Sequence, residues 1–275
     1  MKSFIHNLLV PSRISCLACG KEISESARGY PEICTGCYSS IPWITKSRCN
    51  ICGRHVGCPD CSRKDLTPRH FLMNRSAVAY NTVMKEWLAQ YKFRGNEAYQ
   101  PLMARMMAEA MKRMLYELSL RGGNKKFRFD AVVPVPISEE RMSERCFNQT
   151  RSLAFGAASI SKASVLEILH RRQHTEKQSF KSRRERLESM MGVYTPSSDA
   201  QHCLISIMQK PVKQGRFHSL FENQELTQNA PIRLLIIDDV YTTGSTVDAC
   251  AATLQMLCKS IGATPEIYSL TWARS

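Results

Sequence analysis

The chain has 275 residues, which is enough for one large domain or two unequal domains. Its hydrophobic content of 43% and charged content of 23% are those of a soluble globular protein. The formal charge of +14 indicates anionic partners, although charge alone does not choose among nucleic acid, a phosphosugar and a membrane surface.

Segments that insert into a membrane or direct secretion are not expected. No apolar run approaches the ~18–20 residues that cross a bilayer. The N-terminal sequence MKSFIHNLLVPS has a single Lys and an apolar patch interrupted by His6 and Asn7, which is too weak for a secretory signal. These observations predict a cytoplasmic protein with no membrane insertion.

Cysteines dominate the N-terminal part of the chain. Four Cys-x2-Cys pairs lie between residues 16 and 61: Cys16/Cys19, Cys34/Cys37, Cys49/Cys52 and Cys58/Cys61. The short spacing in each pair lets two thiolates reach one tetrahedral ion, and two pairs complete a four-thiolate site. In a cytoplasmic protein this pattern favours metal over disulfides. We therefore predict two Zn2+ ions, both structural because four thiolates leave no open coordination position for a substrate.

Two pairings of these cysteines fit the spacing. Sequential pairing assigns Cys16, Cys19, Cys34 and Cys37 to one ion and the other four cysteines to the second ion, whereas a cross-braced arrangement mixes them. We favour the sequential arrangement, a double zinc ribbon over residues 1–65. Metal binding must provide much of its folding free energy, because the segment has few large apolar residues.

Residues 76–275 alternate predicted strands and helices. The predicted strands lie at residues 76–80, 127–137, 165–169, 192–194, 234–237 and 264–272. The predicted helices lie at residues 82–94, 99–120 and 247–261, with another after a polar segment that begins at residue 138. The alternation predicts an α/β fold with a mainly parallel sheet flanked by helices. Residues 195–231 show no sustained period, so we expect a long flexible insertion there.

The strongest candidate site lies in the sequence LLIIDDVYTTGST, residues 234–246. Four apolar residues predict a buried parallel strand, and Asp238 and Asp239 follow at its C-terminal end. The turn into the next helix then contains Thr242, Thr243, Gly244, Ser245 and Thr246. N–H groups at a helix N-terminus bind phosphate, and carboxylates accept hydrogen bonds from sugar hydroxyls. The pattern predicts a site for a phosphorylated sugar.

A second group of polar residues follows the predicted strand at 127–137. It consists of Arg141, Arg145, Asn148 and Gln149, near the start of the next helix. Ligands of parallel sheets bind beyond the C-terminal ends of the strands, so this group is expected near the acidic pair. Its cations and amides suit a pyrophosphate.

Residues 234–246 resemble the 5-phosphoribosyl-1-pyrophosphate (PRPP) motif of type I phosphoribosyltransferases at all thirteen positions. The resemblance implies that the turn holds the 5-phosphate. Asp238 and Asp239, the candidate catalytic residues, would take the ribose hydroxyls directly or through Mg2+. It also implies displacement of pyrophosphate at the anomeric carbon through an oxocarbenium-like state, with mainly electrostatic catalysis.

More of the chain resembles the ComF family of competence-associated, phosphoribosyltransferase-like proteins. The resemblance rests on the cysteine pairs, QYKFRGN (90–96), VPVPIS (133–138), R-x-F-N-Q (145–149) and the PRPP motif, in that order. Family members usually have glycine where this chain has Cys146. That change affects the local backbone if the glycine has a positive φ.

The basic segment 171–186 has three interpretations. By resemblance it is a mobile loop that closes over pyrophosphate and contains Gln178 and Arg186. Arg145, Asn148 or the Lys and Arg side chains of residues 177–186 would then face the pyrophosphate. It could instead follow a nucleic-acid backbone or be a solvated run of charges.

Three functional hypotheses follow. The first is a Mg2+-dependent phosphoribosyltransferase, a glycosyltransferase whose acceptor the sequence does not identify. The second is a binding module of natural transformation that handles single-stranded DNA beside a competence helicase, although few aromatic residues lie among the cations for base stacking. The third is a regulator that binds PRPP without turnover. We weight DNA uptake, as a process, above any particular reaction.

Overall fold

A five-stranded sheet forms the centre of the structure, a computed structural model that describes residues 14–62, 68–123, 125–138, 142, 148–172, 192–209 and 230–275. All neighbouring strands are parallel, in the order β3-β9-β8-β4-β5. These strands are β3 (Met73–Ala79), β4 (Ala131–Pro134), β5 (Ser164–Val165), β8 (Ile232–Tyr241) and β9 (Pro265–Arg274).

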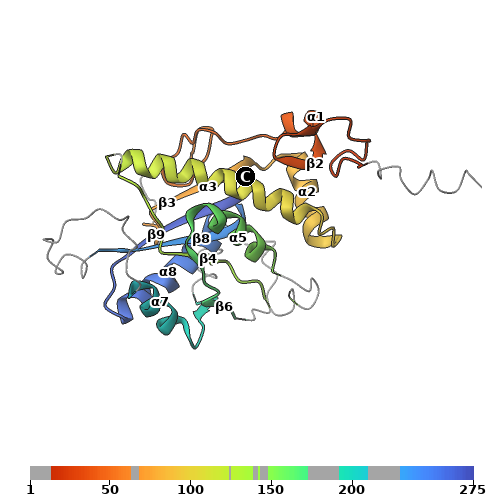
Figure 1. Ribbon diagram of the computed structural model, residues 1–275. Helices are drawn as coiled ribbons and strands as arrows, with labels where there is room; N and C mark the ends of the chain where they lie inside the picture. Colours follow the sequence, from red (N-terminus) through yellow and green to blue (C-terminus); the bar gives the residue numbers. More distant parts are fainter. Residues whose placement is uncertain are drawn as a thin grey trace, which may run out of the picture.

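Helices cover both faces of this sheet (Figure 1). One face packs against α2 (Thr82–Phe93), α3 (Tyr99–Arg121) and α5 (Gln149–Ser161), and the other against α7 (Ala200–Met208) and α8 (Ser245–Ser260). Strand β8 shows why its sequence lacks polar alternation. Leu235 and Ile237 contact the first layer, while Leu234 and Ile236 contact the second, so both faces need apolar side chains. The expected α/β class is confirmed and is consistent with a phosphoribosyltransferase-like fold.

The cysteine-rich segment packs against this α/β unit at two places. Its first part contains β1 (Ser26–Ala27), β2 (Tyr30–Cys34) and α1 (Thr35–Ser39), and buries Tyr30 and Ile33 in the same cluster as α3. Its second part lies against strand β3. There a Cβ on Gly53 would be 2.5 Å from the carbonyl oxygen of Asn74, so the close approach requires glycine. The proposed boundary between residues 1–65 and 76–275 stays a prediction.

One expectation for the middle of the chain is wrong, and a second differs from the structure over its first part. The apolar residues 165–169 form the ends of two strands rather than one. Strand β5 joins the main sheet, whereas β6 (Leu169–Arg171) pairs antiparallel with β7 (Tyr194–Pro196). Residues 195–209 contain α7, whose Ala200 and Leu204 are buried against the α8 layer. The remainder of the expected insertion lies mostly outside the described residues.

Candidate functional site

The sheet changes its winding direction between β4 and β8. The connection through α5 leads from β4 outward to β5, while the connection through α8 leads from β8 in the opposite direction to β9. Ligands of open α/β sheets bind beyond the strand C-termini at such a point. Strand β4 ends at Pro134, which pairs with Ile237, so Asp238 lies just beyond the end of β4. The acidic pair predicted from the sequence therefore lies at the expected ligand position of this fold.

The two carboxylates differ in their surroundings. Asp238 is 8% exposed, and its Oδ1 accepts a hydrogen bond from the backbone N–H of Asp239 at 2.9 Å. Burial, reinforced by the negative charge of Asp239, raises the pKa of Asp238 to about 7. Asp239 is more accessible and forms an ion pair with Nζ of Lys92. One carboxyl group is thus poised to titrate near neutral pH, and the other is held beside a cation.

Lys92 was not among the residues predicted for this site. It lies in the last turn of α2, about 150 positions before the acidic pair, and its side chain is 16% exposed. It belongs to the QYKFRGN segment that carries part of the family resemblance. That segment was the available signal. Lys92 supplies a positive charge directly at the carboxylates.

The turn after β8 is built around Gly244. This residue has φ +82° and is the N-cap of α8. A Cβ here would collide with the ring of Tyr241, so both conformation and space require glycine. Oγ1 of Thr243 and Oγ of Ser245 lie 3.1 Å apart. Asparagine side chains cap α2 and α5, whereas the N-cap of α8 is Gly244, which has no side chain to cap it. Among the described residues, Oγ1 of Thr243 accepts a long hydrogen bond of 3.5 Å from the N–H of Ser245. The first-turn N–H groups of α8 therefore suit an anionic ligand.

The other predicted ligand residues have different outcomes. Asn148 lies at the C-terminal end of β4, as expected, but its Oδ1 accepts hydrogen bonds from N and Oγ1 of Thr150 at 3.1 and 2.6 Å. Oγ1 of Thr150 also lies 2.6 Å from the carbonyl oxygen of Val135, so its single proton serves one of these two acceptors at a time, and this contact ties α5 to the strand end. Asn148 is therefore a helix cap in this structure. Arg145, Cys146, Gln178 and Arg186 lie outside the described residues.

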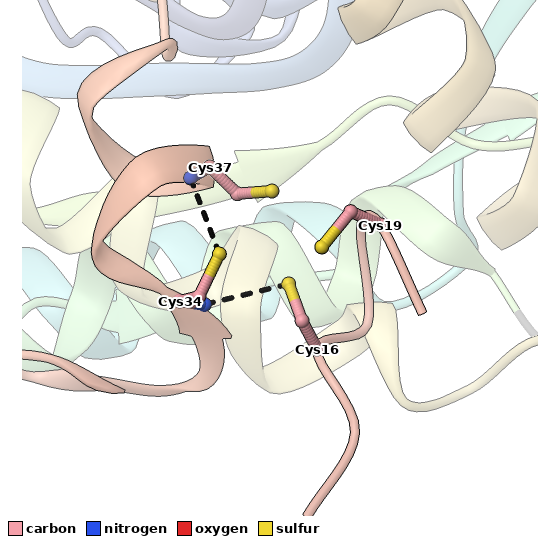
Figure 2. Close-up of side chains that lie close together, drawn as sticks. All are labelled: Cys16, Cys19, Cys34 and Cys37. Carbon is pink, nitrogen blue, oxygen red and sulfur yellow. Dashed lines mark hydrogen bonds between the residues drawn. The ribbon is translucent and has the colours of Figure 1, made fainter. Parts of the chain in front are cut away.

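The eight N-terminal thiols form two groups of four in the sequential arrangement. Figure 2 shows the first group, in which Cys16 and Cys19 face Cys34 and Cys37. The second consists of Cys49, Cys52, Cys58 and Cys61. Within each group all sulfur atoms lie within 4.8 Å of one another. Tetrahedral zinc with Zn–S bonds of about 2.3 Å places its sulfurs ~3.8 Å apart, so both groups fit the ion.

Local hydrogen bonds also favour metal binding. The N–H groups of Cys37 and Cys34 donate to Sγ of Cys34 and Cys16 at 3.5 and 3.4 Å (Figure 2). Burial alone would raise the pKa of Cys16, but backbone donors led by the N–H of Cys34 lower it to about 6. Burial and the neighbouring thiols raise the pKa of Cys37. Zinc would take the place of the protons on the less acidic thiols, and its binding would stabilise the folded ribbon in both groups.

Comparison with known proteins was made over the whole chain. It is 28% identical over 257 residues to the competence protein ComFC of Bacillus subtilis (strain 168), which covers 88% of this chain and 89% of the relative. It is 25% identical over 222 residues to the competence protein ComFC of Streptococcus pneumoniae (strain ATCC BAA-255 / R6), with 78% of each chain covered. This similarity over most of the chain supports its assignment to the ComF family. No protein-family model matches the chain.

The expectation that no segment inserts into a membrane can be compared with the helices that the structure describes. Within the described ranges, no helix has both the length and the apolar character that spanning a bilayer requires.

Proposed function

We propose that the switch point between β4 and β8 binds a 5-phosphorylated ribose, with PRPP as the first ligand to test. The two relatives are named competence proteins, and this chain is likewise competence-associated. The observation that carries the proposal is the placement of an acidic pair beside a helix N-terminus with a glycine N-cap at one sheet edge. In this arrangement the turn would hold the phosphate, and the carboxylates would face the ribose hydroxyls.

The residues present can contact the 5-phosphate of such a ligand, a Mg2+ ion bound with it and its pyrophosphate. The phosphate would accept hydrogen bonds from the N–H groups at the start of α8 and from the hydroxyls of Thr243 and Ser245. Mg2+ prefers oxygen ligands, and the carboxylates of Asp238 and Asp239 supply them once Asp238 is ionised. Lys92 beside Asp239 can contact a pyrophosphate oxygen of the same ligand. Transfer of the phosphoribosyl group to an acceptor is a further step that this proposal does not require.

Calorimetry with PRPP and Mg2+ tests the site. We expect the wild-type protein to bind PRPP. Asp239→Asn should lower the affinity at least tenfold, because it removes the carboxylate charge that pairs with Lys92 and that would contact the ligand. The matched control is Asp130→Asn, because Asp130 lies at the opposite end of the sheet and accepts from the N–H of Arg233. Absence of PRPP binding by the wild-type protein, with Mg2+ present, would exclude the proposal.

A second candidate function, handling of single-stranded DNA, is favoured by a cluster of aromatic and basic side chains. Tyr30, Tyr38 and Trp43 have ring centroids 5.0–6.2 Å apart. The Arg113 guanidinium lies 5.1 Å from the centre of the Trp43 ring, and Lys112 lines the same hollow of about 540 Å³. The sequence showed few aromatics among the cations because these residues come from separate segments, the first ribbon and α3.

This hollow offers two features that single strands use. Stacking on aromatic rings accepts any base, and neighbouring cations attract the backbone. We call these five residues, Tyr30, Tyr38, Trp43, Lys112 and Arg113, the aromatic–basic hollow.

Retention of a fluorescent oligo-dT strand tests the aromatic–basic hollow. Tyr38→Leu keeps the apolar bulk but removes the ring, and we expect about a fivefold to tenfold loss of affinity with an unchanged salt dependence. Tyr116→Leu is the control, because Tyr116 lies on α3 and is 69% exposed. Asp239→Asn should retain DNA fully. Equal retention by wild type and Tyr38→Leu would contradict this role.

A further inference from the structure

The second cysteine cluster lies directly against the candidate phosphate-binding turn. Nη2 of Arg274 donates to Sγ of Cys52 at 3.4 Å. Nη1 of the same guanidinium donates to the carbonyls of Tyr241 and Thr242 at 3.2 and 3.1 Å. Arg274 is 3% exposed and lies 4.7 Å from the centre of the Tyr241 ring. A single buried side chain therefore contacts both a predicted metal ligand and the first peptide groups of the turn.

The segment that follows the cluster holds the next peptide group. Nη2 of Arg69 donates to the carbonyl of Thr243 at 3.0 Å. The neighbouring His70 donates its backbone N–H to Oδ1 of Asp248, in the first turn of α8, at 2.8 Å. The cysteine-rich segment is thus attached to the turn and to the helix start through several independent contacts.

These contacts fix the orientation of three successive peptide groups. Arg274 and Arg69 hold the carbonyls of Tyr241, Thr242 and Thr243. No peptide bond of the described residues is cis, so each N–H points away from the carbonyl of its own peptide group. The N–H groups of Thr242, Thr243 and Gly244 are consequently directed away from the two arginines. Successive N–H groups aligned in this way form an anion-binding concavity.

We propose that Arg274 is a positioning residue that couples metal binding at Cys49, Cys52, Cys58 and Cys61 to phosphate binding at the turn. The inference rests on the proposed PRPP site and adds a means of control to it. A metal-bound cysteine is a thiolate, and a thiolate is a charged acceptor for the guanidinium. Without the metal, no ion holds the four cysteines together, so the Cys52 sulfur is no longer fixed at the position where Arg274 donates to it. The carbonyls of the turn then lose their fixed donor.

Coupling of this kind is reciprocal. If metal at the second cluster strengthens PRPP binding by some factor, PRPP must strengthen metal binding at that cluster by the same factor. The first cluster contacts the other layer of the protein, and its cysteines pack with the α3 side of the core. Only one of the two predicted metal ions should therefore respond to PRPP.

The test follows zinc release to a chelator in the full-length protein, with and without PRPP and Mg2+. We expect PRPP to slow the release of one zinc ion about tenfold and to leave the other unchanged. In Arg274→Met this protection should disappear, and PRPP affinity measured by calorimetry should fall about tenfold. Arg274→Lys should restore part of both effects, because it keeps the charge but not the forked donors.

The control variant is Arg75→Met. Arg75 is also buried and also holds the second cysteine segment, through the carbonyl of Asn50 at 3.2 Å, but it pairs with Glu117 and does not touch the turn. The Arg75→Met variant should be less stable than wild type, but PRPP should still slow the release of one of its zinc ions. Protection of both zinc ions or of neither, or protection that survives in Arg274→Met, would overturn the coupling. If wild-type protein with two zinc ions does not bind PRPP, the proposed function itself fails, and the coupling fails with it.

Discussion

Replacing Cys16 with serine is expected to remove one zinc ion and to lower the melting temperature by more than about 10 °C. Cys16 is 1% exposed and belongs to the core cluster that contains α3. A structural zinc site contributes ~10–16 kcal/mol in isolated peptides, which is comparable with the whole stability of a domain. In a chain of this size, ~1 kcal/mol corresponds to ~2–4 °C in melting temperature. Loss of even a third of the zinc contribution therefore gives the expected shift.

The loss should extend beyond the ribbon, because the ribbon and α3 share contacts. Oη of Tyr99 donates to the carbonyl of Leu17 at 2.9 Å, and Arg105 forms an ion pair with Glu32. Zinc content per chain and the melting curve are the measurements. Cys203→Ser is the control, since Cys203 lies in α7 outside both clusters. A Cys16→Ser protein that keeps two zinc ions and melts within 2 °C or so of wild type would contradict the prediction.

The zinc-ligand pairs of the ribbon could be predicted because the two cysteines of each pair are close together in the sequence. A Cys-x2-Cys spacing brings two thiols to one point whatever the rest of the chain does. The choice between sequential and cross-braced pairing was not local, and the structure groups the thiols sequentially. The position of the second cluster relative to the turn depends on the tertiary structure. Its contact with Arg274 joins positions 222 residues apart, and no spacing rule connects them.

The acidic pair and the glycine turn were likewise predictable, since they lie next to each other in sequence. The strand was expected to end at residue 237, but β8 continues through Asp238 and Asp239 to Tyr241. The partner of Asp239 was not predictable, because Lys92 reaches it from a helix on one face of the sheet. Asn148 has a structural role that the sequence interpretation did not assign, and its role as a ligand stays a prediction. An amide just before a helix is a good ligand, but it is also a good N-cap, and here the cap hydrogen bonds occupy its oxygen.

The errors in the fold came from short elements. Five apolar residues at 165–169 do not reveal whether one strand continues or two strands meet, because periodicity needs a longer window. In the structure, Leu166 donates the last hydrogen bond to β4, and Leu169 begins the pairing with β7. Helix α7 spans only nine residues, and it buries only Ala200 and Leu204. Such a helix is stabilised by packing rather than by its own sequence.

Asp238→Asn is expected to stabilise the ligand-free protein while weakening PRPP binding. Burial, together with the charge of Asp239, raises the pKa of Asp238 from its ordinary value of 3.8 to about 7. The folded state then binds the proton more tightly than the unfolded state, so this group reduces stability progressively as pH rises from about 4 to about 7. A shift of this size corresponds to ~2–4 kcal/mol above pH 7. Asparagine keeps the shape of the protonated carboxyl group and has no such cost.

Melting temperatures measured between pH 4 and pH 8 check this sign. The advantage of Asp238→Asn over wild type should be absent near pH 4, grow to pH 7 and then stay constant. Asp130→Asn, at the far end of the sheet, should show no such growth. An advantage that is constant over the whole range would mean that the substitution acts through packing instead of ionisation.

Protonation of Asp238 should also make PRPP binding depend on pH. A ribose hydroxyl or Mg2+ needs the ionised carboxylate, so PRPP binding must release the proton of Asp238 below pH 7. Affinity should then fall by up to tenfold per pH unit below 7 in the wild type. The phosphates of PRPP titrate too, so the decisive quantity is the wild-type slope minus that of Asp238→Asn. Lys92 and Arg171 stabilise the ionised form of Asp238. Burial, reinforced by the charge of Asp238, raises the pKa of the Cys250 thiol. Equal slopes in the two proteins would show that Asp238 does not face the ligand.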